Sequence, residues 1–333
     1  MRFVILGAGA IGCYVGGRLA AHGRQVTLVG RPRIVQALQR TGLGVSDLDG
    51  FSARVAPQSL HLATSLAAVA LQPQDVVLLC VKGGGTESAA LEIGACCPPG
   101  TTVVSLQNGV DNVARIRAIA PRMKALAGMV ACNVVAPAAD RVHRASAGGL
   151  YMARNSTTCE MALLLDASGL QTTLVNDMVP VQWGKLLLNL NNPVNALSDL
   201  PLRSQLMNRD YRRVLAALQA EALAVLRVAG IRPARVGAVP PRLLPWVLRL
   251  PDRLFGMLAA RLLRIDPLAR SSMWDDVQQG RSTEIDDLCG AVVRLATQHG
   301  TGAPRNAAMC SLVQQHRKGE RMSAAAMRSA ALL

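Results

Sequence analysis

Residues 183–195, WGKLLLNLNNPVN, place one lysine and four asparagines in an otherwise apolar stretch with the composition of a helix. On a helix Lys185, Asn189 and Asn192 stand at positions i, i+4 and i+7, so they share one face. The alternative is an amide-rich face in solvent, but such faces seldom carry several leucines and a single charge. A lysine beside apolar surface needs partners or a lowered pKa, and a lowered pKa suits a general acid that protonates an oxyanion as hydride arrives.

Three other features of the sequence have structural explanations as well as functional ones. Pro193 has no N–H, so the carbonyl of Asn189 loses its helical partner, and a kink or an available carbonyl is expected there. Glu284 stands at the start of a predicted helix, RSTEIDDL, where an acidic residue in the first turn is ordinary helix chemistry. Ser272 and Asp275 have the spacing of a capping box. Taken alone, the last two features indicate helix starts.

An acid that works with hydride needs a domain that binds a hydride donor, and the N-terminus has the pattern of one. RFVILGAGAIG predicts a strand, Phe3–Leu6, followed by a helix, Ile11–Ala21, and then a second strand, Gln25–Val29. The turn between the first strand and the helix is Gly7-x-Gly9-x-x-Gly12, which in this context is the dinucleotide-binding fingerprint.

Each glycine of this turn has a physical reason. Gly7 permits the tight turn, Gly9 lets the backbone approach the pyrophosphate, and Gly12 lets helix and strand pack closely. The start of the helix would face the phosphates with its unpaired N–H groups. The predicted cofactor loop consists of Gly7, Ala8, Gly9, Ala10, Ile11 and Gly12.

The residue after the second strand predicts which dinucleotide is bound. NAD enzymes usually have an acidic residue there for the ribose 2′-hydroxyl, whereas this chain has Arg31, with Arg33 nearby. An arginine matches a 2′-phosphate, although a solvated loop arginine is the alternative. We therefore expect NADP(H) rather than NAD(H).

Two later apolar runs, residues 75–82 and 101–109, end in the polar residues Lys82, Gln107 and Asn108. Ligands of open parallel sheets bind beyond the carboxyl ends of the strands, so these residues are expected near cofactor and substrate. Further strands at 125–135, 141–145 and 150–154 are expected to extend the sheet in antiparallel fashion. A helix near 159–168 and a strand at 170–175 would complete a doubly wound, mostly parallel Rossmann domain at residues 1–176.

The second half, residues 177–333, has helical periodicity and predicts an all-α domain for substrate binding or dimerisation. Helices are expected at Arg209–Gly230 and Ser282–Gly300, each with a glycine stop. The segment 233–267 is rich in Pro, Arg and Leu and reads as an insertion. This segment could be a lid, an oligomer contact or a membrane-surface helix. We favour a packed helical insertion or a subunit contact, and a subunit contact would make the protein a homodimer.

Composition bounds the remaining possibilities. The net charge is +15, but the basic residues are scattered without interleaved aromatics, so a small anionic substrate is expected rather than nucleic acid. The eight cysteines lack metal-like or disulfide-like spacing, so we expect no metal site and a reducing compartment. The longest uncharged apolar stretches are too short to span a bilayer, so no membrane insertion and a cytoplasmic location are expected.

Together these pieces resemble the 2-dehydropantoate 2-reductases (ketopantoate reductases) over nearly the whole chain. The matching pieces are GAGAIG, Arg31 after the second strand, VK at Lys82, QNG at Asn108, WGKLLLN at Lys185 and Asn189, and RSSMWDDVQQGRSTEID at Ser272 and Glu284. The resemblance implies a Rossmann domain joined to a helical domain. It also implies reduction of 2-dehydropantoate by NADPH to (R)-pantoate, for pantothenate and coenzyme A biosynthesis.

The resemblance also assigns roles. It makes Lys185 the general acid that protonates the ketone oxygen, and Glu284 the group that binds the substrate hydroxyl and helps to position Lys185. Asn189 and Ser272 would hold the hydroxyl and carboxylate ends of the substrate. Lys82 and Asn108 would lie near cofactor and substrate, and Asn108 would contact both. Gly7, Gly9, Gly12 and Arg31 would hold NADPH.

The chain departs from the family at four places, one of which is the insertion at 233–267 that lengthens the helical domain. Cys289 stands where the family commonly has asparagine, and KGGGT after Val81 is richer in glycine than usual. The stretch between Asn189 and Pro193 is one residue shorter than in the family, so the second asparagine of the family motif maps to either Asn191 or Asn192. Reduction of another branched 2-oxo acid is therefore the first alternative. A regulatory protein that binds NADP(H) without turnover is the second, and the retained Lys185 and Glu284 argue against it.

Overall fold

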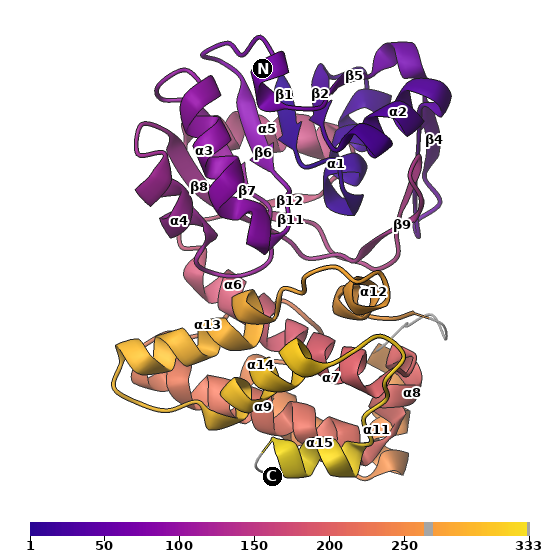
Figure 1. Cartoon of the computed structure of the whole chain (residues 1–333), viewed down its shortest axis with the longest axis vertical. Helices are drawn as coiled ribbons and strands as arrows, with labels where there is room; N and C mark the ends of the chain where they lie inside the picture. The colour runs from indigo at the N-terminus through magenta and orange to yellow at the C-terminus, as the bar shows by residue number, and fades with distance from the viewer. Residues whose placement is uncertain (263–268, 332–333) are drawn as a thin grey trace. The chain divides into compact units, whose positions relative to one another are not determined.

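The structure, a computed structural model, describes residues 1–262 and 269–331 and forms two compact units, Met1–Met178 and Val179–Leu333. The first unit is an α/β domain and the second is helical (Figure 1). The predicted fold class, a mostly parallel sheet followed by an all-helical part, is confirmed. Residues 263–267 of the expected insertion lie outside the described residues.

An eight-stranded sheet forms the centre of the first unit, in the order β12-β11-β8-β7-β6-β1-β2-β5. In chain order its strands are β1 (Phe3–Leu6), β2 (Val26–Val29), β5 (His61–Ala63), β6 (Val76–Leu79), β7 (Thr102–Ser105), β8 (Lys124–Val130), β11 (Leu150–Ala153) and β12 (Thr172–Val175). The strands from β8 to β5 are parallel, whereas β11 pairs antiparallel with β8 and carries β12 parallel to itself.

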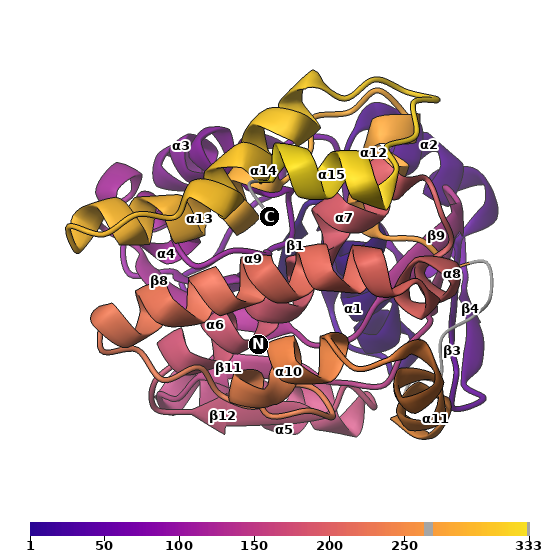
Figure 2. The same cartoon turned by 90° about the horizontal axis from the view of Figure 1, so that it is seen from below.

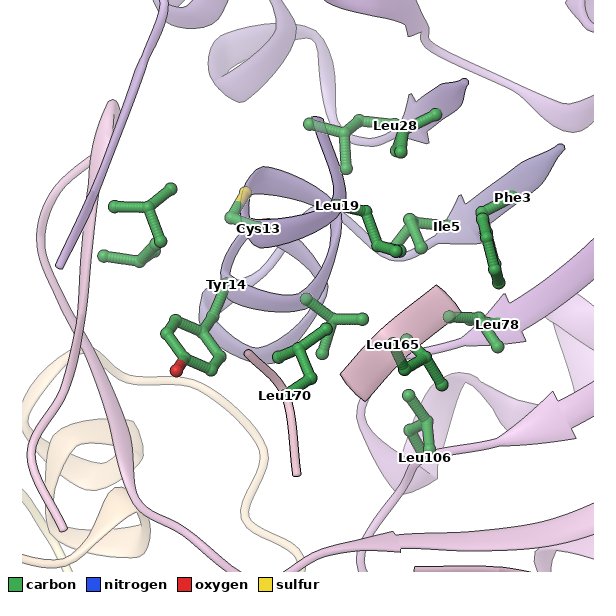
Figure 3. Close-up of a cluster of buried hydrophobic side chains, with 14 of the residues drawn as sticks. Phe3, Ile5, Cys13, Tyr14, Leu19, Leu28, Leu78, Leu106, Leu165 and Leu170 are labelled. Atoms are coloured by element: carbon green, nitrogen blue, oxygen red, sulfur yellow. The ribbon is translucent and has the colours of Figure 1, made fainter. Parts of the chain in front are cut away.

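Helices cover both faces of this sheet, which is why its central strands are apolar at every position. They are α1 (Ala10–Ala21), α2 (Pro32–Thr41), α3 (Thr86–Cys96), α4 (Asn112–Ile119) and α5 (Ser156–Ala167). Alternate residues of β1 point to opposite faces: Phe3 and Ile5 pack in one cluster with α1 and α5, whereas Val4 and Leu6 pack with α3 and α4. Figure 3 shows the first cluster, with Leu19 of α1 beside Ile5.

A second, four-stranded sheet corrects one prediction. It has the order β4-β3-β10-β9 and consists of β3 (Leu43–Asp47), β4 (Ser52–Val55), β9 (Val134–Ala138) and β10 (Arg141–Arg144). The expected antiparallel extension of the main sheet is right for β11. It is wrong for 125–135, because β8 pairs in parallel with β7 and β9 belongs to the second sheet. It is also wrong for 141–145, which forms β10 of the second sheet. The physical reason is that β10 buries only alternate residues, which suits a sheet covered on one face and not the doubly covered main sheet.

A buried ion cluster joins α1 to the second sheet and to the end of α5. The Arg18 guanidinium donates to the Asp47 carboxylate (2.8 Å) and to the Ser168 carbonyl (2.9 Å). Arg144 of β10 lies 3.4 Å from the same carboxylate, and its Nε donates to the Tyr14 hydroxyl (3.0 Å). Because buried charges are costly unless paired, this cluster fixes where the second sheet packs.

Helix α9 (Arg209–Val228) is the central element of the second unit, and most of the other helices pack against it (Figure 2). They are α6 (Val179–Asn189), α7 (Asn191–Ser198), α8 (Leu202–Met207), α10 (Leu244–Leu248), α11 (Asp252–Leu262), α12 (Ser272–Gln278), α13 (Ile285–Gln298), α14 (Pro304–Gln315) and α15 (Ala324–Ala330). The two predicted helices are confirmed as α9 and α13. Within the described residues, no helix is both long and apolar enough to cross a membrane.

The described part of the 233–267 segment is packed onto the helices. The fully buried Arg212 of α9 donates to the carbonyls of Leu248 (3.0 Å) and Leu250 (2.8 Å), and its guanidinium stacks 4.2 Å from the ring centre of Phe255. Nearer the start of the segment, the Ala234 N–H donates to the carbonyl of Pro180 at the start of α6 (2.8 Å). These contacts fasten the segment to α9 and α6.

Candidate active site

The polar residues predicted for the cofactor side follow four neighbouring strands. Gly7, Arg31, Lys82 and Asn108 come after β1, β2, β6 and β7, respectively, and these strands are adjacent and parallel in the sheet. Their carboxyl ends therefore meet at one edge, where open parallel sheets bind their ligands. The structure thus brings these four residues to the same edge of the first unit.

The glycine loop has the geometry that a dinucleotide requires. Gly7 has φ +111°, and a Cβ there would lie 2.6 Å from the Val81 nitrogen. A Cβ on Gly12 would lie 2.1 Å from the Gly7 carbonyl oxygen, so helix and turn touch. At Gly9 a Cβ would meet nothing within 4 Å, and no side chain caps the start of α1. The loop therefore leaves room and backbone donors for a phosphate.

The flanks of this loop differ in exposure. Ala8 is buried, whereas Ala10 and Ile11 are half-buried at the start of α1. A Cβ on Gly30 would lie 2.5 Å from the Ala8 Cβ, so a glycine is needed where β2 ends beside the loop. Sequence reasoning missed Gly30, although its place directly before Arg31 is a usable signal. Arg31 begins α2 as its exposed N-cap residue, which suits contact with a ligand phosphate.

A polar network fixes the loops after β6 and β7. The buried Thr86 hydroxyl accepts a hydrogen bond from the Gln107 amide and donates to the Gly83 carbonyl, both at 2.8 Å. The Asn112 amide donates to the Asn108 carbonyl (2.7 Å). Gln107 is thus turned inward and supports the loop, while Asn108 stays half-buried at the strand end. Thr86 and Asn112 are positioning residues that the sequence pattern did not reveal.

Lys82 stands at the surface of the neighbouring loop. It is exposed and precedes the short 3₁₀ turn Gly83–Gly85, which leads into α3. The three glycines of KGGGT form this turn, and its backbone is held by the Gly83 carbonyl contact with Thr86. The glycine-rich departure therefore shapes the loop that carries Lys82.

The lysine–asparagine strip lies on two consecutive helices. Helix α6 ends at Asn189 and α7 begins at Asn191, so the helix is interrupted at Leu190, as Pro193 predicts. Lys185, Asn189 and Asn192 are half-buried, whereas the leucines at 186, 187 and 190 are fully buried. The strip therefore forms the less buried side of an otherwise apolar helix pair.

The four asparagines of this stretch have different roles. Asn191 accepts a hydrogen bond from the Gln205 amide (3.1 Å). Asn195 is fully buried, accepts from the Ser271 N–H (2.9 Å) and donates to the Leu200 carbonyl (2.9 Å). Asn191 and Asn195 thus hold helices together. Of the two residues to which the second family asparagine could map, Asn192 is the one that lines a pocket.

That pocket lies within the second unit and gathers three predicted residues. Its lining consists of Asn192, Ser272, Met273, Asp276, Glu284 and Leu288. An amide, a hydroxyl and two carboxylates thus stand close together with two apolar side chains. Lys185 and Asn189 are outside this lining and lie on the turns of the strip that precede Asn192.

Two helix starts differ from the predicted ones. The capping box at Ser272 and Asp275 is wrong, because Ser271 is the N-cap and its hydroxyl accepts from the Trp274 N–H (3.2 Å). The N–H of Ser271 is already bound to Asn195, which sets the helix start one residue earlier and leaves the Ser272 side chain exposed. Glu284 is the N-cap of α13 rather than part of its first turn, and its side chain makes no capping hydrogen bond.

Asp276 is a pocket residue that sequence reasoning missed. It is almost fully buried. Its carboxylate accepts a hydrogen bond from Nε of Arg281 and forms an ion pair with Nη2 of the same residue, each at 2.9 Å. The Arg281 N–H also donates to the Asp276 carbonyl (2.8 Å). This pair fixes the turn that leads to Glu284. The available signal was the i+4 spacing from Ser272, which places both side chains on one face of α12.

Comparison with known proteins gives consistent matches to one family. The family model described as ketopantoate reductase PanE/ApbA matches residues 3–156, and that of its C-terminal part matches residues 177–317. A 2-dehydropantoate 2-reductase of Halobacterium salinarum is 29% identical over 321 residues, which cover 94% of this chain and 98% of the relative.

Solved structures agree with this match. A PanE/ApbA family ketopantoate reductase from Ralstonia eutropha superposes with a TM-score of 0.78 at 28% identity, covering 94% of this chain and 97% of that one. The ternary structure of D-mandelate dehydrogenase with NADH and anilino(oxo)acetate has a TM-score of 0.77 at 20% identity and covers 99% of both chains. The second likeness shows the fold alone.

Proposed function

Because the chain belongs to the ketopantoate reductase PanE/ApbA family, we propose that it reduces the ketone of 2-dehydropantoate to (R)-pantoate with NADPH. The protein is an oxidoreductase that uses a nicotinamide cofactor, and its product serves pantothenate and coenzyme A biosynthesis. The observation that carries the choice of reaction is the pocket that unites Asn192, Ser272 and Glu284 next to the strip bearing Lys185.

On the cofactor side, the first unit binds and orients. NADPH, when bound, supplies the hydride that reduces the ketone carbon. The open space at Gly9 and the uncapped start of α1 fit its pyrophosphate. Arg31, exposed after β2, would pair with the 2′-phosphate, which supports NADP(H) over NAD(H). Lys82 and Asn108 would bound the same edge of the sheet.

On the substrate side, Lys185 would donate the proton that the ketone oxygen needs as it gains negative charge. Glu284 would accept a hydrogen bond from the substrate hydroxyl. Asn189, Asn192 and Ser272 would donate hydrogen bonds that orient the hydroxyl and carboxylate ends.

The departure at Cys289 does not alter the lining of the pocket. Cys289 is fully buried on α13 and is absent from the lining, which its neighbour Leu288 joins. The substitution therefore changes the packing behind the pocket wall rather than a group that touches the ligand. This placement supports the family substrate over another branched 2-oxo acid.

The test is NADPH oxidation by the purified protein with 2-dehydropantoate, and with NADH in parallel. Lys185→Ala should lower kcat by about 10²–10⁴-fold, the usual contribution of a general acid. Lys318→Ala is the matched control, because Lys318 is an exposed lysine and should leave kcat unchanged. NADPH binding without turnover of 2-dehydropantoate, or full activity in Lys185→Ala, would contradict the proposal.

A further inference from the structure

Asp199, the residue directly after α7, has a backbone conformation that few side chains adopt. It closes α7 in the left-handed region, with φ +49° and ψ +31°. Within the described residues, Gln171 is the only other non-glycine residue with a positive φ. Glycine is the usual residue at such a helix end because it has no Cβ. An aspartate there indicates that its carboxylate has a task that glycine could not perform.

The Asp199 carboxylate binds two side chains from the start of α12. Its Oδ1 accepts a hydrogen bond from the indole Nε1 of Trp274 (2.6 Å) and another from Nη1 of Arg270 (3.2 Å). The Arg270 guanidinium also stacks 4.1 Å from the centre of the Trp274 ring. One carboxylate oxygen therefore holds both a residue that precedes α12 and a residue in its first turn.

Helix α12 has a second attachment to α7, about one helical turn before Asp199. The Ser271 N–H donates to the side-chain oxygen of Asn195 (2.9 Å), and the Ser271 hydroxyl donates to the Asn192 carbonyl (3.3 Å). The two helices lie side by side (Figure 2). Because a helix of seven residues has little stability of its own, the position of α12 depends on these attachments.

The two attachments enclose the pocket residues of α12. Ser272 and Met273 line the pocket and lie between Ser271 and Trp274 in the chain. An attachment at Ser271 alone would leave α12 free to turn about its first residue. With the Trp274 indole held as well, both ends of the first turn are fixed, and so is the direction in which Ser272 leaves the helix.

We propose that Asp199 is a positioning residue of the substrate pocket, which sets the place of Ser272 through its hydrogen bond with Trp274. Asp199 is not part of the pocket lining, so it acts through α12 rather than by touching the ligand. This role rests on the proposed function, in which Ser272 holds one end of the substrate. Since the hydroxyl and carboxylate ends do not react during hydride transfer, the effect falls on KM rather than on kcat.

Two substitutions at Asp199 separate the carboxylate from the backbone. Asp199→Asn keeps an acceptor oxygen and tolerates the left-handed conformation. Asp199→Gly keeps the conformation and removes the acceptor. KM for 2-dehydropantoate should stay near that of the parent in the asparagine variant. It should rise about tenfold in the glycine variant, as expected for the loss of a hydrogen bond to a charged group, with kcat little changed in both.

Trp274→Phe breaks the same hydrogen bond from the other side. It keeps an aromatic ring beside Arg270, removes the indole N–H and should raise KM about tenfold as well. The double variant with Asp199→Gly should be no worse than either single variant, because one shared contact can be lost only once. Asp210→Asn is the matched control, since Asp210 is an exposed aspartate of the same unit whose ion pair is with Arg328 of α15 (3.4 Å).

A second readout does not depend on the substrate. Hydrogen exchange followed by mass spectrometry should show faster exchange of the backbone amides of residues 271–278 in Asp199→Gly than in the parent or in Asp199→Asn. The amides of α5, in the first unit, should keep their parent rates. A parent that does not turn over 2-dehydropantoate would contradict the proposed function, whereas unchanged exchange at 271–278 in Asp199→Gly would overturn the role of Asp199.

Three kinetic results would also overturn this role. They are a parent-like KM in Asp199→Gly, a KM in Asp199→Asn as high as that in Asp199→Gly, and effects of the two single variants that multiply in the double variant. Urea midpoints of all variants identify a folding defect. Trp274→Phe leaves the backbone of Asp199 untouched, so it decides the proposal even where Asp199→Gly lowers the midpoint.

Discussion

Replacing Gly9 by alanine should weaken NADPH binding without weakening the fold. A Cβ at Gly9 meets nothing within 4 Å, and the residue has φ −90° and ψ −165°, which alanine adopts freely. Alanine is a poorer N-cap than glycine by several tenths of a kcal/mol. It also restricts the unfolded chain, which stabilises by about 0.4–1 kcal/mol. The two effects nearly cancel, so the free energy of unfolding should change by less than about 0.5 kcal/mol.

Gly12→Ala provides the contrast. A Cβ there would lie 2.1 Å from the Gly7 carbonyl oxygen and 2.9 Å from Cγ2 of Ile5. A backbone oxygen cannot turn away as a flexible side chain can, so α1 must move away from the turn. Overpacking of this kind costs about 1–3 kcal/mol. Gly12→Ala should therefore lose stability and cofactor affinity together.

The assay pairs urea unfolding of the ligand-free proteins with NADPH titration followed by fluorescence. In Gly9→Ala the new methyl occupies the approach of the phosphate. The Kd should rise about 10–100-fold, which corresponds to roughly 1.4–2.8 kcal/mol, while the urea midpoint stays in place. Parent-like NADPH affinity in Gly9→Ala would refute the reasoning. So would a loss of affinity that merely follows a loss of stability.

Three further predictions concern buried polar groups. Arg212→Met should destabilise the protein to urea by about 3–5 kcal/mol, because three backbone carbonyls lose a buried charged donor; a change under 1 kcal/mol would contradict this. Burial alone would raise the pKa of Asp47, but backbone N–H donors and Arg144 lower it overall, so its stabilisation is present above its unfolded pKa near 4 and is lost as pH falls. Asp47→Asn should therefore flatten the pH dependence of the unfolding free energy in acid; an unchanged slope there would count against the ion cluster. Asn195→Ala should raise KM for 2-dehydropantoate more than it lowers kcat. The reason is that the Ser271 N–H at the start of α12 loses its acceptor, and α12 carries the pocket residue Ser272. An effect on kcat alone would contradict this prediction.

Local patterns in the sequence predicted the parts of this molecule that depend on neighbouring residues. The turn at Gly7, Gly9 and Gly12 follows from steric limits on a few adjacent residues, and the helix interruption before Pro193 follows from one missing N–H. The parallel sheet follows from apolar runs that both faces must cover. Such signals are contained within about ten residues.

Long-range pairs were outside the reach of those patterns. The start of α12 is set by Asn195, which is distant in sequence from Ser271, so the capping box suggested by local spacing was misplaced by one residue. The ion pair of Asp276 with Arg281 joins residues only five apart, but it forms across the turn after α12, whose conformation the sequence pattern does not give. The second sheet likewise depends on a partner strand much later in the chain.

That late partner has a consequence for synthesis on the ribosome. The Ser46 hydroxyl of β3 lies 2.9 Å from Nδ1 of His143 in β10, and the two residues are 97 positions apart. While β5 to β8 emerge, β3 keeps an open edge of unpaired N–H and C=O groups, which other chains can join. During the same interval Asp47 lacks its ion pair with Arg144. A nascent chain stalled before residue 141 would therefore have its cofactor loop made and one sheet still exposed to aggregation.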